Sequence, residues 1–218
     1  MPNKIIQKSR MWKYFIEATV NIIQEEGMDQ VTIRKVADRA GYNSSTIYNY
    51  FKDLSHLTFF ASMTLLKDYT NELASYIKLG DTPLDKYKLA WECFSKYSFS
   101  QPEIFHTVFI MDLGAQPEKL LEEYYEIYPS DLINIPESIK PILLQRSVFK
   151  RGESMLNIAV NNGLINKNQA EDINEMTNLV WQGMLTTVLN NRTNYDIDEA
   201  LKMTMKYITK IIVNETEK

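Results

Sequence analysis

The sequence predicts an all-α protein, because helix signals occur along nearly the whole chain and strand signals are almost absent. Apolar residues recur at three- and four-residue spacing, which is the period of a helix that buries one face. Capping residues, Gly and Pro separate these stretches. With 218 residues, of which 44% are hydrophobic, the chain is long enough to bury a sizeable core.

The first expected helix runs from Ser9 to Glu26 and ends at Gly27. Two short helices are expected next, over residues 33–40 and 44–50. Thr32 is a suitable cap for the first of them, and a glycine between the two permits a sharp turn. Two short helices around such a turn have the form of a helix-turn-helix, although plain packing gives the same pattern. The apolar stripe of the first helix, on which they would pack, comprises Trp12, Phe15, Ile16, Thr19, Ile22 and Ile23.

Further helices are expected over the rest of the chain. Asp53 can cap a long helix that continues to about Lys78, and Thr82 to Asp85 have the form of a capping box with proline in the first turn. The remaining expected helices begin after Ser100-Gln101 at Pro102, run from Pro117 to before Pro129, and cover about 138–161, 168–190 and 196–213.

Composition narrows the class of protein. The first residues lack the apolar run of a signal peptide, and the most apolar stretch, residues 57–66, is too short to span a bilayer, so we expect a cytoplasmic protein. Cys93, His56 and His106 form no ligand cluster at metal-site spacing. Motifs for nucleophilic, phosphate-binding or metal-assisted catalysis are absent. We therefore expect no metal, no cofactor and no enzymatic activity.

Charge is distributed unevenly along the chain. The formal net charge is −4, but residues 1–56 carry +2 and the remainder carries −6. This polarity has the sign expected of a DNA-reading part attached to an acidic body.

The second short helix has the residue types of a DNA-reading element. Its apolar positions, Ile47 and Phe51, anchor it inward, which leaves short hydroxyl and amide side chains facing outward. Such groups donate to phosphate oxygens or base edges at little desolvation cost. A solvated surface without a ligand is the alternative reading. The outward residues are Ser44, Ser45, Thr46, Tyr48 and Asn49.

Residues 32–57, TIRKVADRAGYNSSTIYNYFKDLSHL, resemble the DNA-binding domain of the tetracycline-repressor-like (TetR) family of transcriptional regulators. The match covers about residues 9–57. It implies a three-helix N-terminal DNA-binding domain with a helix-turn-helix, residues 1–54, followed by a larger helical effector-binding and dimerisation domain, residues 55–218. The second part carries no diagnostic motif of its own.

The resemblance also assigns roles to residues. Thr32 would cap its helix and donate to phosphate, Arg34 would reach base edges or backbone, and Tyr48 would bind a phosphate. Two departures stand out: Tyr42 replaces a small apolar turn residue, and Leu54 replaces a phosphate-binding lysine for which Lys52 is placed to compensate. The complete expected DNA-binding set is Thr32, Arg34, Lys35, Ser44, Ser45, Thr46, Tyr48, Asn49 and Lys52.

The last two expected helices carry apolar stripes that suit a homodimer interface, as the resemblance also implies. The core of a single subunit is the alternative place for the same residues. The expected interface consists of Ile173, Met176, Val180, Met184, Leu201, Met205, Ile208 and Ile212.

Aromatic residues are frequent between residues 80 and 190 and suit an apolar effector pocket, although ordinary core packing explains them equally well. His106 would either orient a polar group of the ligand or be a structural histidine with satisfied hydrogen bonds. The expected ligand-binding residues are Trp91, Phe94, Phe105, His106, Phe109, Phe149 and Trp181.

These observations predict a repressor that binds a near-palindromic operator as a homodimer and is released by a small, largely apolar effector. The alternative is a helical small-molecule-binding or interaction protein of the same fold without DNA-binding activity, which Leu54 in place of lysine favours. The effector, the operator sequence and the regulated genes are left open by the sequence.

Overall fold

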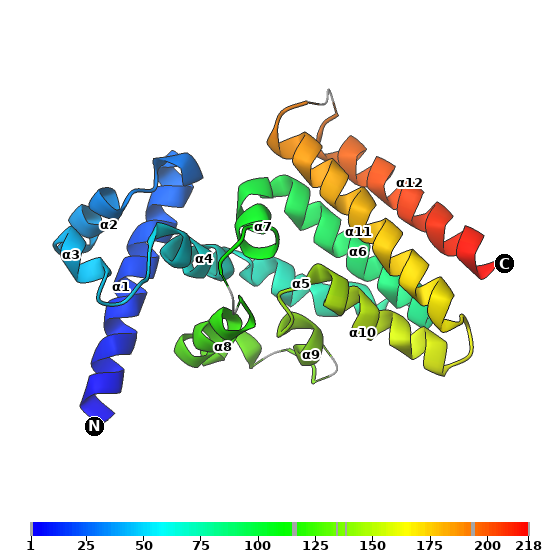
Figure 1. Cartoon of the computed structure of the whole chain (residues 1–218), viewed down its shortest axis with the longest axis horizontal. Coiled ribbons are helices and arrows are strands. Elements are labelled where there is room, and N and C mark those ends of the chain that lie inside the picture. The colour runs from blue at the N-terminus through cyan, green and yellow to red at the C-terminus, as the bar shows by residue number, and fades with distance from the viewer. Residues whose placement is uncertain (1, 115–116, 134, 138, 193–194, 218) are drawn as a thin grey trace.

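The computed structural model describes residues 2–114, 117–133, 135–137, 139–192 and 195–217, with only the backbone described for 2–7 and 117. Within these ranges the chain forms helices and turns and contains no β-strand, so the predicted all-α fold is confirmed. A small group of helices lies at one end, and a larger bundle leads to the C-terminus at the other (Figure 1). We call residues 2–53 the head and residues 67–217 the body.

The head consists of α1 (Pro2–Glu26), a 3₁₀ turn (Met28–Gln30), α2 (Ile33–Ala40) and α3 (Ser44–Ile47). Thr32 caps α2 as expected, because its hydroxyl accepts a hydrogen bond from the Lys35 amide. Gly41 has a φ of 76° and ends α2 in the left-handed conformation that glycine adopts without steric cost. The helix-turn-helix is therefore set by local capping on both sides of the turn.

The second short helix ends earlier than expected. α3 stops at Ile47 and not at residue 50, and a turn covers the next three residues. The amides of Asn49 and Tyr50 bond the carbonyls three residues back, which tightens the chain before Phe51 enters the core.

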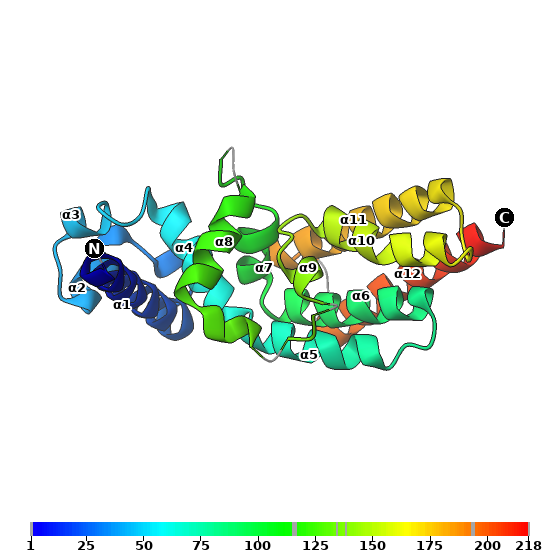
Figure 2. The ribbon, with the colours of Figure 1, turned by 90° about the horizontal axis from the view of Figure 1, so that it is seen from below.

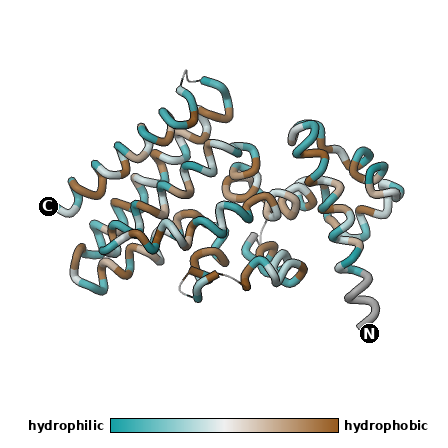
Figure 3. Tube along the Cα trace, turned by 180° about the vertical axis from the view of Figure 1, so that it is seen from behind, coloured by the Kyte–Doolittle hydropathy of each residue, from teal (hydrophilic) through white to brown (hydrophobic). Residues whose placement is uncertain are grey.

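α4 (Leu54–Leu65) joins the head to the body. The carboxylate of Asp53 accepts from the His56 amide at 2.8 Å and caps α4 as expected. Residues 57–63 are all buried, and α4 forms a hydrophobic tract between the two parts (Figure 3). On the head side, the Trp12 ring contacts the rings of Phe51 and Phe60 at centroid distances of 4.6 and 4.7 Å. The expected boundary between residues 54 and 55 lies inside this helix and stays a prediction.

The expected long helix from Asp53 to Lys78 is broken at Leu66, which corrects the sequence prediction. α4 ends there and α5 (Lys67–Lys78) begins. Thr64 and Thr70 donate their hydroxyls to the carbonyls of Ala61 and Leu66, on either side of the break. Threonine bonds of this kind bend helices because they compete for backbone carbonyls.

The remaining elements form the body. They are α6 (Pro83–Ser100), α7 (Pro102–Phe109), α8 (Pro117–Ile127), a 3₁₀ turn (Pro129–Leu132), α9 (Lys140–Leu143), α10 (Val148–Asn161), α11 (Lys167–Leu189) and α12 (Ile197–Thr216). α12 packs against α11 and α6, α10 packs against α11, and α7 packs against α4. α8 lies beside α4 between the head and the bundle (Figure 2). None of the described helices is both long enough and apolar enough to cross a membrane.

The expected helix over 138–161 is also divided, and its first residue, Ser138, lies outside the described residues. α9 and α10 are separated by residues 144–147. The Arg151 side chain of α10 reaches back across this gap. Its Nε and Nη2 donate hydrogen bonds to the carbonyls of Gln145 and Leu143, at 2.5 and 3.1 Å. Ser147 then caps α10 through the Lys150 amide. Side-chain hydrogen bonds from Arg151 to carbonyls six and eight residues earlier thus bridge the break between the two helices.

Buried polar groups hold α6, α10 and α11 together. The hydroxyls of Tyr87 and Thr177 lie 2.7 Å apart, and Asn174 donates to the carbonyl of Phe149 at 2.9 Å. Gly152 lets the helices approach closely, because a Cβ at this position would lie 2.1 Å from the Asn174 Oδ1. This neutral network fixes the α10–α11 wall of the body.

Candidate nucleic-acid interface and effector pocket

The helix-turn-helix packs on α1 through aromatic contacts. Ile47 and Phe51 are buried, as expected for the inward face of the second helix. Tyr42, the large residue in the turn, lays its ring against Phe15 at a centroid distance of 5.4 Å, and Tyr50 reaches the same ring at 5.9 Å. The unusual turn residue is therefore accommodated at the surface of the head, where its ring covers Phe15 of the core.

The predicted recognition residues do not all face outward equally. Ser45, Tyr48 and Asn49 are exposed, and Tyr48 is 57% exposed. Ser44 and Thr46 are half-buried. The structure brings these five residues together on α3 and the turn that follows it.

Basic residues of α2 divide into free and paired side chains. The Arg34 side chain is 89% exposed, and its nearest carboxylate, Asp38, lies 3.9 Å away. Lys35 points instead toward α1, where its ammonium lies 2.8 Å from Glu26. The hydrogen bond from Lys35 holds the pKa of the Glu26 carboxyl below its ordinary value. Arg34 is thus better placed than Lys35 for an external phosphate.

The positions around Leu54 form the junction with α8. Leu54 is half-buried against the core, and Lys52 is exposed. The Lys52 amide donates to Nδ1 of His56, whose Nε2 lies 4.0 Å from Glu123 of α8. Burial lowers the pKa of His56, which favours its neutral form at neutral pH. The expected phosphate contact of Lys52 stays a prediction.

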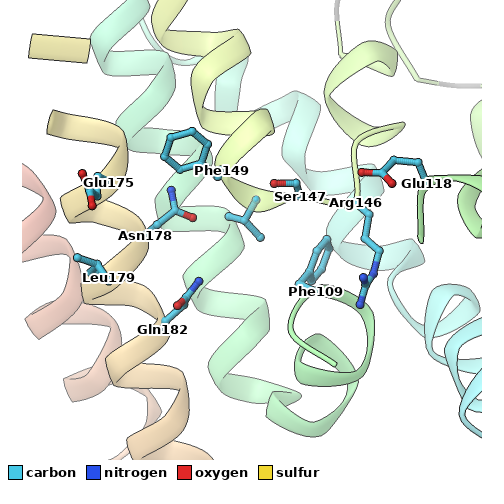
Figure 4. A pocket seen from close by; sticks show the side chains of 10 residues that line it. Phe109, Glu118, Arg146, Ser147, Phe149, Glu175, Asn178, Leu179 and Gln182 are labelled. Carbon is cyan, nitrogen blue, oxygen red and sulfur yellow. The ribbon is translucent and has the colours of Figure 1, made fainter. Parts of the chain in front are cut away.

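An open pocket of about 560 Å³ lies between α7, α8, α10 and α11. Figure 4 shows Phe109, Arg146 and Glu118 on one side of it and Glu175, Asn178 and Leu179 on the α11 side. Arg146 donates through Nε to the Val108 carbonyl at 2.6 Å and through Nη2 to the Met111 carbonyl. Two of the predicted ligand-binding residues, Phe109 and Phe149, line this pocket.

A second, smaller space of about 40 Å³, which we call the aromatic hollow, lies between α5, α6, α9 and α10. It contains two more predicted residues, Trp91 and Phe94. Its volume accommodates little more than a water molecule. Its full lining is Tyr69, Leu73, Tyr87, Ala90, Trp91, Phe94, Ile142, Val148, Arg151, Gly152 and Met155.

The other predicted ligand-binding residues line neither space. Phe105 and Trp181 are fully buried, and the Trp181 indole donates to the Ser98 hydroxyl at 3.0 Å. His106 is half-buried. These three residues pack in the body without lining either space. This is the ordinary core packing that the sequence allowed as the alternative to a pocket.

The predicted dimer residues also divide by burial. Ile173, Ile208 and Ile212 lie in the core of the subunit, which the sequence also allowed. The remaining five, Met176, Val180, Met184, Leu201 and Met205, are half-buried. Sequence reasoning missed two exposed positions on α11: Leu179 is 62% exposed, and Gly183 has open space around its Cβ position. Their spacing of one helical turn was the signal available in the sequence.

Sequence reasoning also missed Arg146 and Arg151, which bound the two spaces. Each arginine stands next to apolar residues that were expected to continue one helix. An arginine within an expected core helix is a signal for a buried polar site, because arginine is rarely buried without a partner.

Residues 15–57 match the family described as bacterial regulatory proteins, tetR family. The chain is also similar to the HTH-type transcriptional regulator BetI of Stenotrophomonas maltophilia (strain R551-3). The two are 32% identical over 89 residues, which cover 40% of this chain and 45% of BetI, so the match spans less than half of that regulator.

Solved structures share the arrangement over most of the chain. RolR, determined in complex with resorcinol, has a TM-score of 0.61 and 13% identity, covering 97% of this chain and 93% of RolR. The transcriptional regulator FadR from Bacillus subtilis, in complex with stearoyl-CoA, has a TM-score of 0.56 and 16% identity, covering 90% and 97%. Similarities at these identities establish a common fold.

Proposed function

Because the chain belongs to the tetR family of bacterial regulatory proteins, we propose that it is a repressor that binds a near-palindromic operator as a homodimer and leaves it when a small effector binds. The family is one of transcriptional regulators and not of enzymes. The proposed elements are DNA reading by the head, dimerisation through α11 and α12, and effector binding in the body.

One observation carries the proposal: the head presents short polar side chains on an element anchored from behind by buried rings. Ser45, Tyr48 and Asn49 are exposed, whereas Ile47 and Phe51 are buried. Hydroxyl and amide groups on an anchored helix suit contacts to phosphates and base edges in the major groove.

Dimerisation is supported by the exposed face of α11. Leu179 and Gly183 lie one turn apart on this helix, beside half-buried Met176 and Val180. An exposed leucine next to a glycine with free space allows a partner helix to approach closely. A two-fold axis at this face would position the two heads of the dimer so that each reaches one of two successive major grooves.

Effector release is supported by contacts that run from the open pocket to α4. Arg146 and Phe109 line the pocket, and Arg146 bonds carbonyls at the end of α7. α7 packs against α4, which begins at the head. Since α4 and α5 are separate helices, α7 is the more direct link. A ligand acts here only if it prefers the arrangement that does not fit DNA.

The solved structures of similar fold contain ligands of very different sizes: RolR was determined with resorcinol and the Bacillus subtilis FadR with stearoyl-CoA. A coupling of about 1–3 kcal/mol between effector and operator would change DNA affinity by about 5- to 150-fold. By linkage, operator DNA must weaken effector binding by the same factor.

DNA binding is tested by gel shift with the intergenic DNA beside the protein's own gene. Tyr48→Phe should weaken binding to all sequences, because it removes a phosphate contact, whereas Ser45→Ala should change the preferred base at one position by roughly 1–3 kcal/mol. Ser154→Ala, an exposed serine of α10, is the matched control. Absence of DNA binding by a folded dimer would favour the alternative, a small-molecule-binding protein of the same fold.

Dimerisation is tested by sedimentation of the wild-type protein and of Leu179→Glu. The wild type should sediment as a dimer, and the charged variant should dissociate because it buries an unpaired carboxylate at the interface. Leu79→Glu is the matched control, because Leu79 is 75% exposed at the end of α5. A monomeric wild type contradicts this part of the proposal.

A further inference from the structure

Arg151 is a buried cation that lines the aromatic hollow. It is 7% exposed and projects from α10, where its guanidinium also lies over the Phe109 ring at 4.8 Å. Its hydrogen bonds go to the carbonyls of Gln145 and Leu143 and to the hydroxyl of Tyr69, the last at 3.4 Å. Every one of these groups is electrically neutral.

No carboxylate pairs with Arg151 in the part of the chain that the structure describes. Burial raises the pKa of Tyr69 to about 12, so this phenol is uncharged at neutral pH and does not balance the arginine. A buried charge without a counter-ion is energetically unfavourable, and cores rarely retain one without a functional reason.

The guanidinium also retains unused hydrogen-bonding capacity. Arginine has five N–H donors, and the three hydrogen bonds of Arg151 use one on Nε and one on each terminal nitrogen. One donor therefore remains on each terminal nitrogen. Two such donors in one plane match the two oxygens of a carboxylate.

The remaining wall of the hollow is apolar. Trp91, Phe94 and Leu73 belong to it, and Arg151 is its only charged side chain among the described residues. The open pocket differs, because Glu118 and Glu175 stand in its wall beside Arg146. Of the two spaces, the aromatic hollow is the one whose charge favours an anion.

We propose that the aromatic hollow binds a small apolar monocarboxylic acid, whose carboxylate pairs with Arg151 and whose apolar part lies among Trp91, Phe94 and Leu73. The proposal rests on the function proposed above, since it names the chemical class of the effector. It places the effector in the hollow, next to the open pocket, and the Phe109 ring of α7 that Arg151 contacts belongs to the wall of that pocket, so both spaces share the link through α7 to α4. The hollow must widen to admit such a molecule, and Met155 is the unbranched, flexible side chain of its wall that can yield. Binding supplies the counter-ion that the described residues of the subunit do not provide.

The test compares acids with their neutral isosteres. Phenylacetate, 3-phenylpropanoate and octanoate are titrated into the wild-type protein by calorimetry, each beside its primary amide. We expect at least one acid to bind at least about tenfold more tightly than its amide, because a charge-assisted hydrogen bond replaces a neutral one. Equal affinities for each pair, or no binding by any of the acids, would overturn the proposal.

Variants of single arginines test whether the preference for the acid over its amide arises at Arg151. Arg151→Gln should remove the preference for the acid, Arg151→Lys should retain part of it, and Arg192→Gln, an exposed arginine after α11, should leave it unchanged. A preference that survives Arg151→Gln contradicts the assignment. If Arg151→Gln does not fold, the wild-type pairs and Arg151→Lys still decide the question. Gel shifts on the same preparations separate the two proposals: DNA binding with no acid preference refutes only the effector class.

Discussion

The head and the body balance their basic side chains in opposite ways. In the head, Lys35 and Arg39 meet Glu26 and Glu25 at 2.8 and 2.6 Å near the surface. In the body, Arg151 is buried and donates only to neutral groups among the described residues. These two cations of the head therefore have carboxylate partners within the subunit, whereas Arg151 of the body has none among the described residues.

The two parts also differ in what stabilises them. Exposed ion pairs contribute little to stability and weaken with salt. The body relies on buried, neutral hydrogen bonds between α6, α10 and α11, such as the contact between Tyr87 and Thr177. Breaking these leaves a buried polar group without a partner. Substitutions in the body should therefore cost more stability than substitutions of paired charges in the head.

The largest effect is expected for Gly152→Ala. The new Cβ would lie 2.1 Å from the Asn174 Oδ1 and 3.4 Å from the Tyr87 ring, so the α10–α11 wall must move apart. We expect a loss of about 2–3 kcal/mol in the free energy of unfolding, measured by urea denaturation. Ser154→Ala is the matched control on the same helix: Ser154 is exposed, and its change should alter the free energy of unfolding by no more than about 0.5 kcal/mol. Equal effects of the two would refute the close approach.

A smaller loss is expected for Tyr87→Phe. The change removes one buried hydroxyl and leaves Thr177 without that contact, although Thr177 still donates to the Ile173 carbonyl. We expect about 1–1.5 kcal/mol, with no dependence on salt between low and high ionic strength. If the loss in the free energy of unfolding disappears in high salt, this network depends on charge in the same way as the ion pairs of the head.

A weaker effect is expected for Arg39→Met in the head. Its pairs with Glu25 and Glu26 are partly exposed, so we expect about 0.5 kcal/mol at low salt and less at high salt. Arg34→Met is the control, because that side chain is 89% exposed and its carboxylate lies 3.9 Å away. A loss for Arg39→Met as large as that for Tyr87→Phe would break the comparison between the two parts.

The smallest effect concerns pH. The folded protein lowers the pKa of Glu26 below 4.5, chiefly through the hydrogen bond from Lys35. The ionised carboxylate therefore stabilises the fold above the unfolded pKa, and this contribution is lost as pH falls through the lowered folded pKa. We expect wild type to exceed Glu26→Gln in stability at pH 7 and to lose the advantage in acid. The free energy of unfolding of both proteins is measured by denaturation at each pH. A difference between them that stays constant across this range would exclude the ion pair as its source.

Elements with local signals were predictable from the sequence. Thr32, Asp53 and the capping box at Thr82 each satisfy backbone amides within a few residues, and the structure contains all three. The inward positions Ile47 and Phe51 were predictable for the same reason, because helical spacing and residue type agree there.

Features that depend on distant contacts were not predictable. The gap between α9 and α10 follows from Arg151 reaching back to Leu143, and the direction of Lys35 is set by Glu26 on another helix. Phe105 and Trp181 could not be separated from pocket residues, because a helix packed on several sides carries apolar residues all round. Periodicity identifies what is buried but not what it is buried against.

The three tryptophans are divided between the two parts of the molecule. Trp12 lies among the rings of the head, and Trp91 and Trp181 lie in the body with centroids 6.2 Å apart. Each part thus contains its own intrinsic fluorophore. A protein that keeps only Trp12 reports melting of the head, and one that keeps only the other two reports melting of the body. Their emission curves coincide only if the chain unfolds as one cooperative unit.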